Sequence, residues 1–175
     1  MRPVFLYCLV AILLLSCSKN KDEYKQGSKV DIYVLKSFSE NVGMAGGMAV
    51  ISISNAVLAD APLVSDQDIE SYTRATTTFK IKKDIKSIIE NYSKDKAFAV
   101  TVDNQPVYFG KFHPLYLSSM TLGVATLNPI SYSLHTNNEL QIDFITITGN
   151  SSLQHLDKRN DSRILDALRA SGRLK

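Results

Sequence analysis

Apolar and polar residues alternate along several short stretches of the chain, with the period of a half-buried β-strand. The alternation is clear in "KVDIYVLKSF", "AVISIS", "TTTFKIK" and "AFAVTV", where β-branched residues are frequent. The same character continues in "AVLA", "VYFGKF", "TLGVATL" and "ELQIDFITI". The pattern predicts about six or seven strands, most of them next to one another in the sequence.

A glycine-rich stretch, "SENVGMAGGM", interrupts this pattern after Phe38. Its three glycines, Gly43, Gly46 and Gly47, lack the spacing of a dinucleotide-binding or P-loop fingerprint. The stretch is therefore expected to be a mobile loop between two strands, and not a phosphate site.

Helical signals occur in three segments. Ser65 or Asp66 is placed to cap a short helix in "PLVSDQDIESY". The spacing in "DIKSIIENYS" predicts an amphipathic helix whose apolar face consists of Ile85, Ile88, Ile89 and Tyr92. Near the C-terminus, Asp161 is a candidate N-cap and Gly172 marks the end of a helix. The apolar face of this last helix consists of Ile164, Ala167 and Leu168. Together these elements predict a single α+β domain, with a mostly antiparallel sheet and two or three helices packed on it.

The stretch "AFAVTVDNQPVYFGKF" predicts a β-hairpin. If its loop covers residues 103–106, Val102 faces Val107 and Val100 faces Phe109, so this side is wholly apolar and belongs to the core. Thr101 and three residues of the second strand then lie on the other side, which is either solvent-facing or a binding surface.

Four aromatic rings gather in and after the second strand of this hairpin, and exposed aromatic rings are common in recognition surfaces. Core packing is the alternative for them. Gly110 bears on that choice, because a glycine inside a strand often marks a bulge or a close approach of another group. The predicted binding surface consists of Tyr108, Gly110, Phe112, His113, Tyr116, Ser118 and Ser119.

Ser118 or Ser119, His113 and Asp103 also supply the residue types of a hydrolase triad. No Gly-x-Ser-x-Gly elbow accompanies them, and aspartate is common in turns for conformational reasons. The three histidines have no paired spacing, so we expect no metal site, no cofactor and no catalysis.

The N-terminal residues "MRPVFLYCLVAILLLSC" have one positive charge ahead of an apolar run that is too short to cross a bilayer. This arrangement predicts a secretory signal peptide. Its end, "LLSC", resembles the lipobox of bacterial lipoproteins. The resemblance implies cleavage before Cys17, with acyl chains such as palmitate attached to that residue. An ordinary signal peptide, with Cys17 incidental, is the alternative.

Removing residues 1–16 leaves about 159 residues, enough for one domain. A flexible tether is expected over residues 17–29 and the α+β domain over residues 30–175. The mature chain keeps 19 basic residues against 17 acidic ones, a balance that argues against a nucleic-acid partner. With Cys8 removed and Cys17 lipidated, the domain has no thiol for disulfides, metals or nucleophilic catalysis.

The residues after the cysteine bear on localisation. Ser18 stands where an aspartate would resemble an inner-membrane retention signal, which favours the outer membrane. "SKNKDEY" resembles the short tags that send some Bacteroidota lipoproteins to the cell surface. Whether the domain faces the periplasm or the surface stays open.

Two resemblances extend over the domain. The segments "DIESY", "VDNQPVYFGKF" and the serine pair after them resemble a family of bacterial lipoproteins, many from Bacteroidota, for which the resemblance implies no activity. More distantly, "DIESY" followed by a helix and "AFAVTVDNQPVY" is similar to the periplasmic head domain of the SecD translocation subunit. This second resemblance implies a shared α+β fold and no shared function.

These observations lead to one functional expectation and two alternatives. We expect a membrane-anchored envelope lipoprotein whose domain is a non-catalytic binding module for an envelope protein or a glycan. The first alternative is a structural component of an envelope assembly. The second is a hydrolase that uses the region of His113 and Ser119.

Overall fold

A computed structural model describes residues 27–84, 86–114, 120–128, 138–145 and 151–175. The strands are β1 (Val30–Ala45), β2 (Met48–Leu58), β3 (Ile69–Thr73), β4 (Thr78–Ile81), β5 (Ala97–Val102), β6 (Gln105–Phe112), β7 (Ala125–Leu127), β8 (Glu139–Gln141) and β9 (Asp143–Phe144). The helices are α1 (Lys86–Ile89) and α2 (Ser162–Ala170), with 3-10 turns at Asp66–Asp68 and Ser151–Leu156. The predicted signal peptide and Cys17 lie outside the described residues.

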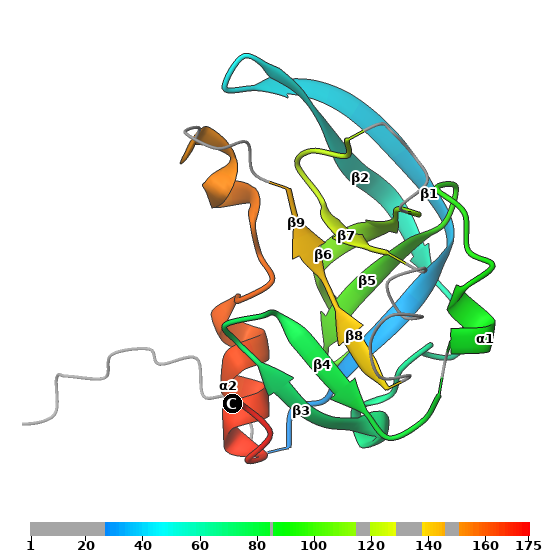
Figure 1. The fold of residues 1–175 in the computed structure, drawn as a ribbon, viewed down its shortest axis with the longest axis vertical. Helices are drawn as coiled ribbons and strands as arrows, with labels where there is room; N and C mark the ends of the chain where they lie inside the picture. Colours follow the sequence, from blue (N-terminus) through cyan, green and yellow to red (C-terminus); the bar gives the residue numbers. More distant parts are fainter. Residues whose placement is uncertain (1–26, 85, 115–119, 129–137, 146–150) are drawn as a thin grey trace, which may run out of the picture.

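The strands form two sheets, and α2 lies beside the smaller one (Figure 1). The larger sheet has the order β2-β1-β5-β6-β7-β9, and the smaller has the order β3-β4-β8. Every pairing between these strands is antiparallel except that of β6 with β7. The predicted mostly antiparallel pairing is therefore confirmed, although the strands form two sheets and not one.

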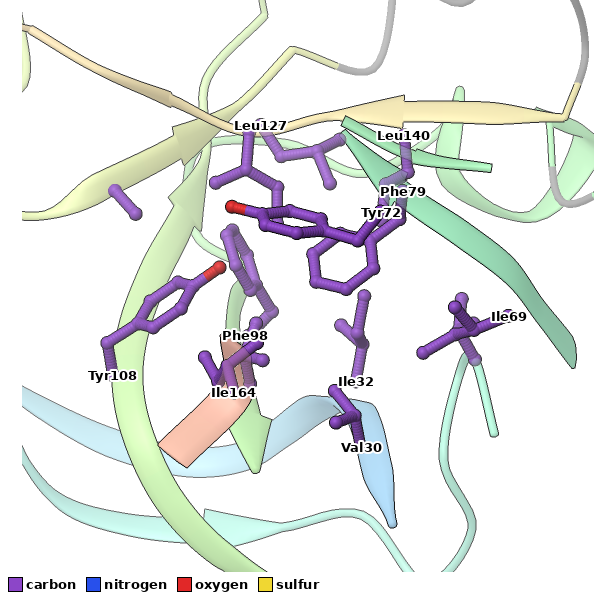
Figure 2. Packing of buried hydrophobic residues seen from close by; sticks show 14 of the residues in the cluster. Val30, Ile32, Ile69, Tyr72, Phe79, Phe98, Tyr108, Leu127, Leu140 and Ile164 are labelled. Carbon is purple, nitrogen blue, oxygen red and sulfur yellow. The ribbon is translucent and has the colours of Figure 1, made fainter. Parts of the chain in front are cut away.

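The main core lies between the larger sheet, the smaller sheet and α2. Tyr72 and Phe79 from the smaller sheet meet Val30, Ile32 and Phe98 from the larger one, and all are buried (Figure 2). The rings of Tyr72 and Phe79 lie 4.5 Å apart between centroids. Burial of this much apolar surface is the dominant stabilising contribution to such a fold.

The opposite face of the larger sheet has its own apolar cluster. Leu35, Ala97 and Ala99 are buried there, and Ile53 and Phe109 pack against them. Every residue of β5 is consequently buried. A strand covered on both faces reads as an apolar run, as "AFAV" does.

β1 and β2 form one long hairpin, so the prediction of a mobile loop in "SENVGMAGGM" is wrong. β1 continues to Ala45, and the turn consists of Gly46 and Gly47, with φ of +57° and +78°. Two successive residues with positive φ are typical of the tight turns that match the twist of a hairpin, and glycine adopts them without steric cost. The other residues of the stretch keep the two-residue period of a strand. The hairpin end lies at the top of Figure 1.

The β5–β6 hairpin has a register different from the predicted one. Its turn contains only Asp103 and Asn104, with φ of 50° and 65°, and Val102 pairs with Gln105. A register shift follows, after which Val100 pairs with Tyr108. Because side chains alternate between the two faces of a strand, a shift of one residue moves the whole set to the other face. Tyr108, which was predicted on the second face, therefore points into the main core (Figure 2).

The observed helices agree only in part with those predicted from the sequence. α2 has Asp161 as its N-cap, with the carboxylate accepting from the backbone N of Arg163 at 3.1 Å, and Gly172 follows its end with φ of +71°. Its buried residues are Ile164, Leu165, Ala167 and Leu168. α1 is a single turn in which Ile89 is buried and Ile88 is exposed. Of the two or three predicted helices, α2 is the only one of more than one α-helical turn in the described ranges.

The domain begins slightly before Val30. Ser28 is already buried, and the backbone N of Lys29 donates to the Asp103 carboxylate at 2.9 Å. The last two residues of the predicted tether, Ser28 and Lys29, thus contact the domain.

The segment predicted as a short helix after Ser65 is one 3-10 turn that leads into β3. Its capping box closes through Asp68, whose carboxylate accepts from the Ser65 backbone N at 3.0 Å and from the Ser65 hydroxyl at 2.6 Å. The ammonium of Lys83 lies 2.7 Å from the same oxygen. Partial burial raises the pKa of Asp68, but the hydrogen bonds from Lys83 and Ser65 outweigh it and lower the pKa to about 2.

This lowered pKa predicts an acid-sensitive contribution to stability. A carboxylate whose pKa is lower in the folded state stabilises the fold above its unfolded pKa and loses that contribution as the pH falls from about 4 to about 2. We expect Asp68→Asn to cost about 1 kcal/mol at neutral pH and almost nothing at about pH 2. Urea unfolding of both proteins at the two pH values measures the difference, with Asp60→Asn as an exposed control. An equal cost at both pH values would contradict the prediction.

Candidate functional site

Three residues of the predicted binding surface are buried, which corrects that prediction. Phe112 is fully buried, with its ring centroid 4.8 Å from that of Tyr92 and 5.5 Å from that of Phe98. Tyr108 is buried as well, and burial raises the pKa of its hydroxyl well above the ordinary value, so this group stays protonated. Gly110 faces the Phe98 ring at a distance that leaves no room for a side chain. The register of the β5–β6 hairpin places all three in the core.

The remaining residues of that predicted surface have different outcomes. His113 is half-buried at the end of β6. Tyr116, Ser118 and Ser119 lie outside the described residues.

The hydrolase triad considered as an alternative does not form with Asp103 as its carboxylate. Asp103 lies at the β5–β6 turn and His113 follows the far end of β6. The eight residues of β6 correspond to roughly 25 Å of extended strand. Asp103 binds the backbone N of Lys29 instead. A carboxylate must touch the imidazole to orient it, so Asp103 has no part in a triad with His113.

A pocket of about 330 Å³ opens beside His113, where the loop before β5 meets the β1–β2 hairpin. We call it the charged pocket. It is lined by Glu40, Ile51, Lys94, Asp95, Lys111, Phe112, His113, Met120 and Thr121. Its volume is at the lower end of the range for small-molecule sites, about 300–1,000 Å³.

An ion pair lies at the inner wall of this pocket. Lys111 is only 8% exposed, and its ammonium bonds the Glu40 carboxylate on β1. Removing one partner of such a pair would leave an uncompensated charge in a poorly hydrated site, which is costly. The pair therefore joins the β1–β2 hairpin to the centre of the larger sheet.

His113 is held in place by two hydrogen bonds. Its backbone N donates to the carbonyl of Leu127 at 2.8 Å, and its Nδ1 lies 3.1 Å from the Thr121 hydroxyl. Within the described part of the chain, no other hydrogen bond of the ring is found. The Thr121 contact fixes the ring at the wall of the pocket.

The outer part of the β1–β2 hairpin exposes apolar side chains. Val42 is 74% exposed and Met44 is 72% exposed. Two residues apart on one strand, they lie on the same face, and we call them the hairpin patch. Their cross-strand partners on β2 are Ile51 and Ala49. Residues 41–59 contain no charged side chain, and Glu40, the next residue on the same face of β1, is paired with Lys111.

The hairpin is fixed against the segment before β7. The backbone N of Ile51 donates to the carbonyl of Leu122 at 2.8 Å. Gly123 has φ of +90°, and a Cβ there would lie 2.8 Å from the Ile51 carbonyl oxygen and 2.9 Å from the Val50 Cβ. Only glycine fits this approach. The strand opposite Val42 is therefore attached to the segment before β7 at Ile51.

The sequence contained signals for this surface, but the glycines next to them obscured the strand pattern. Val42 and Met44 continue the alternation of β1, but the neighbouring glycines directed the interpretation to a loop. Gly123, within "TLGVATL", is a glycine in a strand-like run and marks the close approach of another strand. The charged pocket combines five separate segments of the chain, and no local motif predicts it.

Comparison with protein-family models, with curated proteins and with solved structures finds no match to this chain. Within the described ranges, no group of three or more histidine, cysteine, aspartate or glutamate side chains could hold a metal ion. Nor does any helix of this part of the chain have the length and apolar character needed to span a membrane.

Proposed function

We propose that this chain is a lipid-anchored protein of the bacterial cell envelope that binds a protein partner through the hairpin patch and performs no chemistry of its own. The anchor is Cys17, at the end of the lipobox-like "LLSC". Two or three acyl chains hold a domain on a membrane almost permanently, since each buried methylene contributes about 0.8 kcal/mol. The outer membrane is the favoured location.

The observation that carries the proposal is the exposure of Val42 and Met44 side by side on a hairpin that is hydrogen-bonded to the segment before β7. Apolar side chains at the centre of a protein–protein interface are typically surrounded by few charges, and the hairpin has none over residues 41–59. Attraction to anionic lipid headgroups requires lysine or arginine, which this segment lacks. Recognition of a glycan relies on polar and aromatic side chains, and neither Val42 nor Met44 provides them. A protein surface is the partner that fits.

The position of the hairpin patch agrees with this proposal. β1 starts where the tether enters the domain, and its 16 residues extend away from that point. A strand of this length covers roughly 50 Å along its path. The hairpin patch thus lies at the other end of the strand from the anchor, within reach of proteins beyond the membrane surface.

The test is capture of the tagged protein after cross-linking in living cells. We expect Val42→Ser/Met44→Ser to reduce the captured partner at least tenfold, because about 2 kcal/mol of apolar contact is removed. Val57→Ser is the matched control, since Val57 is 51% exposed on β2 but does not belong to the patch. Cys17→Ala tests whether capture needs the anchor. Full retention of the partner by a folded double variant would contradict the proposal.

A further inference from the structure

The charged pocket contains two charges of each sign beside apolar walls. Glu40 and Asp95 provide carboxylates, and Lys94 and Lys111 provide ammonium groups. From this arrangement we infer that the pocket binds a small zwitterion with an apolar side chain, that is, an apolar α-amino acid. The inference goes beyond the proposed function and does not depend on the hairpin patch.

Lys94 and His113, two residues of the pocket lining, can bind the carboxylate of such a ligand. Lys94 is exposed and has no ion pair within the described part of the chain, and the Nε2 of His113 is free of protein partners there. An ammonium has three donors, and a ring nitrogen can supply one more when it carries a proton. Together Lys94 and His113 offer charge-assisted hydrogen bonds to one carboxylate.

Glu40 and Asp95, the two carboxylates of the pocket lining, can bind the ammonium of the same ligand. Glu40 uses Oε1 for Lys111, and a carboxylate has about four acceptor sites, so acceptor capacity remains. Among the described residues, the Asp95 carboxylate accepts one long hydrogen bond, of 3.4 Å, from the Ser93 hydroxyl. A simple anion would face these two carboxylates without compensation, and a simple cation would face the two lysines. A zwitterion complements both sets.

The apolar lining of the pocket and its volume determine which side chain and which size of ligand fit. Ile51, Phe112 and Met120 line the pocket between the charged groups. A volume of about 330 Å³ accommodates a single amino acid and leaves no room for a large cofactor. The side chain of the ligand would pack on Ile51 and Met120.

Calorimetric titration of the full-length protein in detergent micelles tests this inference, with three probes that share a phenyl ring and differ in their charged groups. L-phenylalanine has both charged groups, 3-phenylpropionate lacks the ammonium and phenethylamine lacks the carboxylate. We expect L-phenylalanine to bind at least tenfold more tightly than either analogue, after subtraction of titrations into empty micelles. Equal affinity for all three, or no saturation up to about 10 mM L-phenylalanine, would overturn the inference.

Isosteric variants of the two exposed charges locate the binding. Asp95→Asn should weaken L-phenylalanine about fivefold and leave 3-phenylpropionate unchanged. Lys94→Gln should weaken both of these and leave phenethylamine unchanged. Lys36→Gln and Asp60→Asn, which break an exposed ion pair elsewhere, are the controls. Unchanged L-phenylalanine affinity in both pocket variants would contradict the assignment to the charged pocket, whether or not the partner of the hairpin patch is found.

Discussion

Phe112→Ala is expected to lower the free energy of unfolding by about 3–5 kcal/mol. Phe112 is fully buried, and its ring makes edge-on contacts with Tyr92 and Phe98. Truncation removes these contacts and leaves a cavity that the surrounding strands, paired on both sides, cannot close. The result separates the two interpretations of the β5–β6 hairpin, because an exposed recognition residue in the same position would tolerate alanine.

Urea denaturation followed by circular dichroism measures this change. Val42→Ala is the matched control, since an exposed position away from special features changes stability by less than about 0.5 kcal/mol. A loss below about 1 kcal/mol for Phe112→Ala would contradict the placement of this face in the core.

Gly110→Ala is expected to cost about 3 kcal/mol, although it adds a single methyl group. A Cβ at this position would lie 2.2 Å from the Phe98 Cζ and 2.8 Å from the carbonyl oxygen of Ala125. The Phe98 ring is itself fully buried, and the carbonyl belongs to the neighbouring strand β7. Neither can move without disrupting the main core or the β6–β7 pairing.

Gly43→Ala provides the control for this prediction. Gly43 also lies inside a strand, but a Cβ there would meet nothing within 4 Å. Alanine should therefore be neutral or slightly stabilising at Gly43, since it reduces the freedom of the unfolded chain. Thermal unfolding of the two variants side by side gives the comparison, and similar melting temperatures would refute the close contact at Gly110.

Much of the fold was predictable from local patterns. The cap at Asp161, the apolar face of α2 and the end at Gly172 are specified by residues within one segment, and all three predictions are confirmed. Most strand positions were predictable for the same reason, but β3 lies in a segment for which a helix was predicted and the end of β1 in a stretch predicted as a loop. The helix predicted around Ile88 is a single turn, because its apolar spacing continues for barely two turns. Ile89 is buried in the main core and Tyr92 packs against it from the loop that follows.

The register of the β5–β6 hairpin could not be derived from alternation alone. Both sides of β6 carry apolar residues, so the pattern allows either face to be buried. The two-residue turn at Asp103 and Asn104 decides the matter, and the shift after it sets Tyr108 opposite Val100. Tyr108, Gly110 and Phe112 were placed on an exposed face as a consequence of this single step.

In the long β1–β2 hairpin, the extent of the strands could not be derived from the local sequence. Its glycines were interpreted as a break in the strand, whereas Gly46 and Gly47 form the turn itself. Whether a glycine ends a strand or turns it depends on pairing with a distant segment, here the contact of Ile51 with Leu122. The charged pocket likewise depends on this long-range arrangement, because it brings Glu40 to Lys111.

The central claim is that the hairpin patch is the surface through which this protein meets its partner. Photo-cross-linking in living cells tests it most directly, with p-benzoylphenylalanine replacing Met44 in one strain and Val57 in another. We predict a discrete cross-linked partner from position 44 and none from position 57, with the product lost when Val42→Ser is added. Equal cross-linking from both positions, or none from position 44 in a folded and anchored protein, would contradict the account.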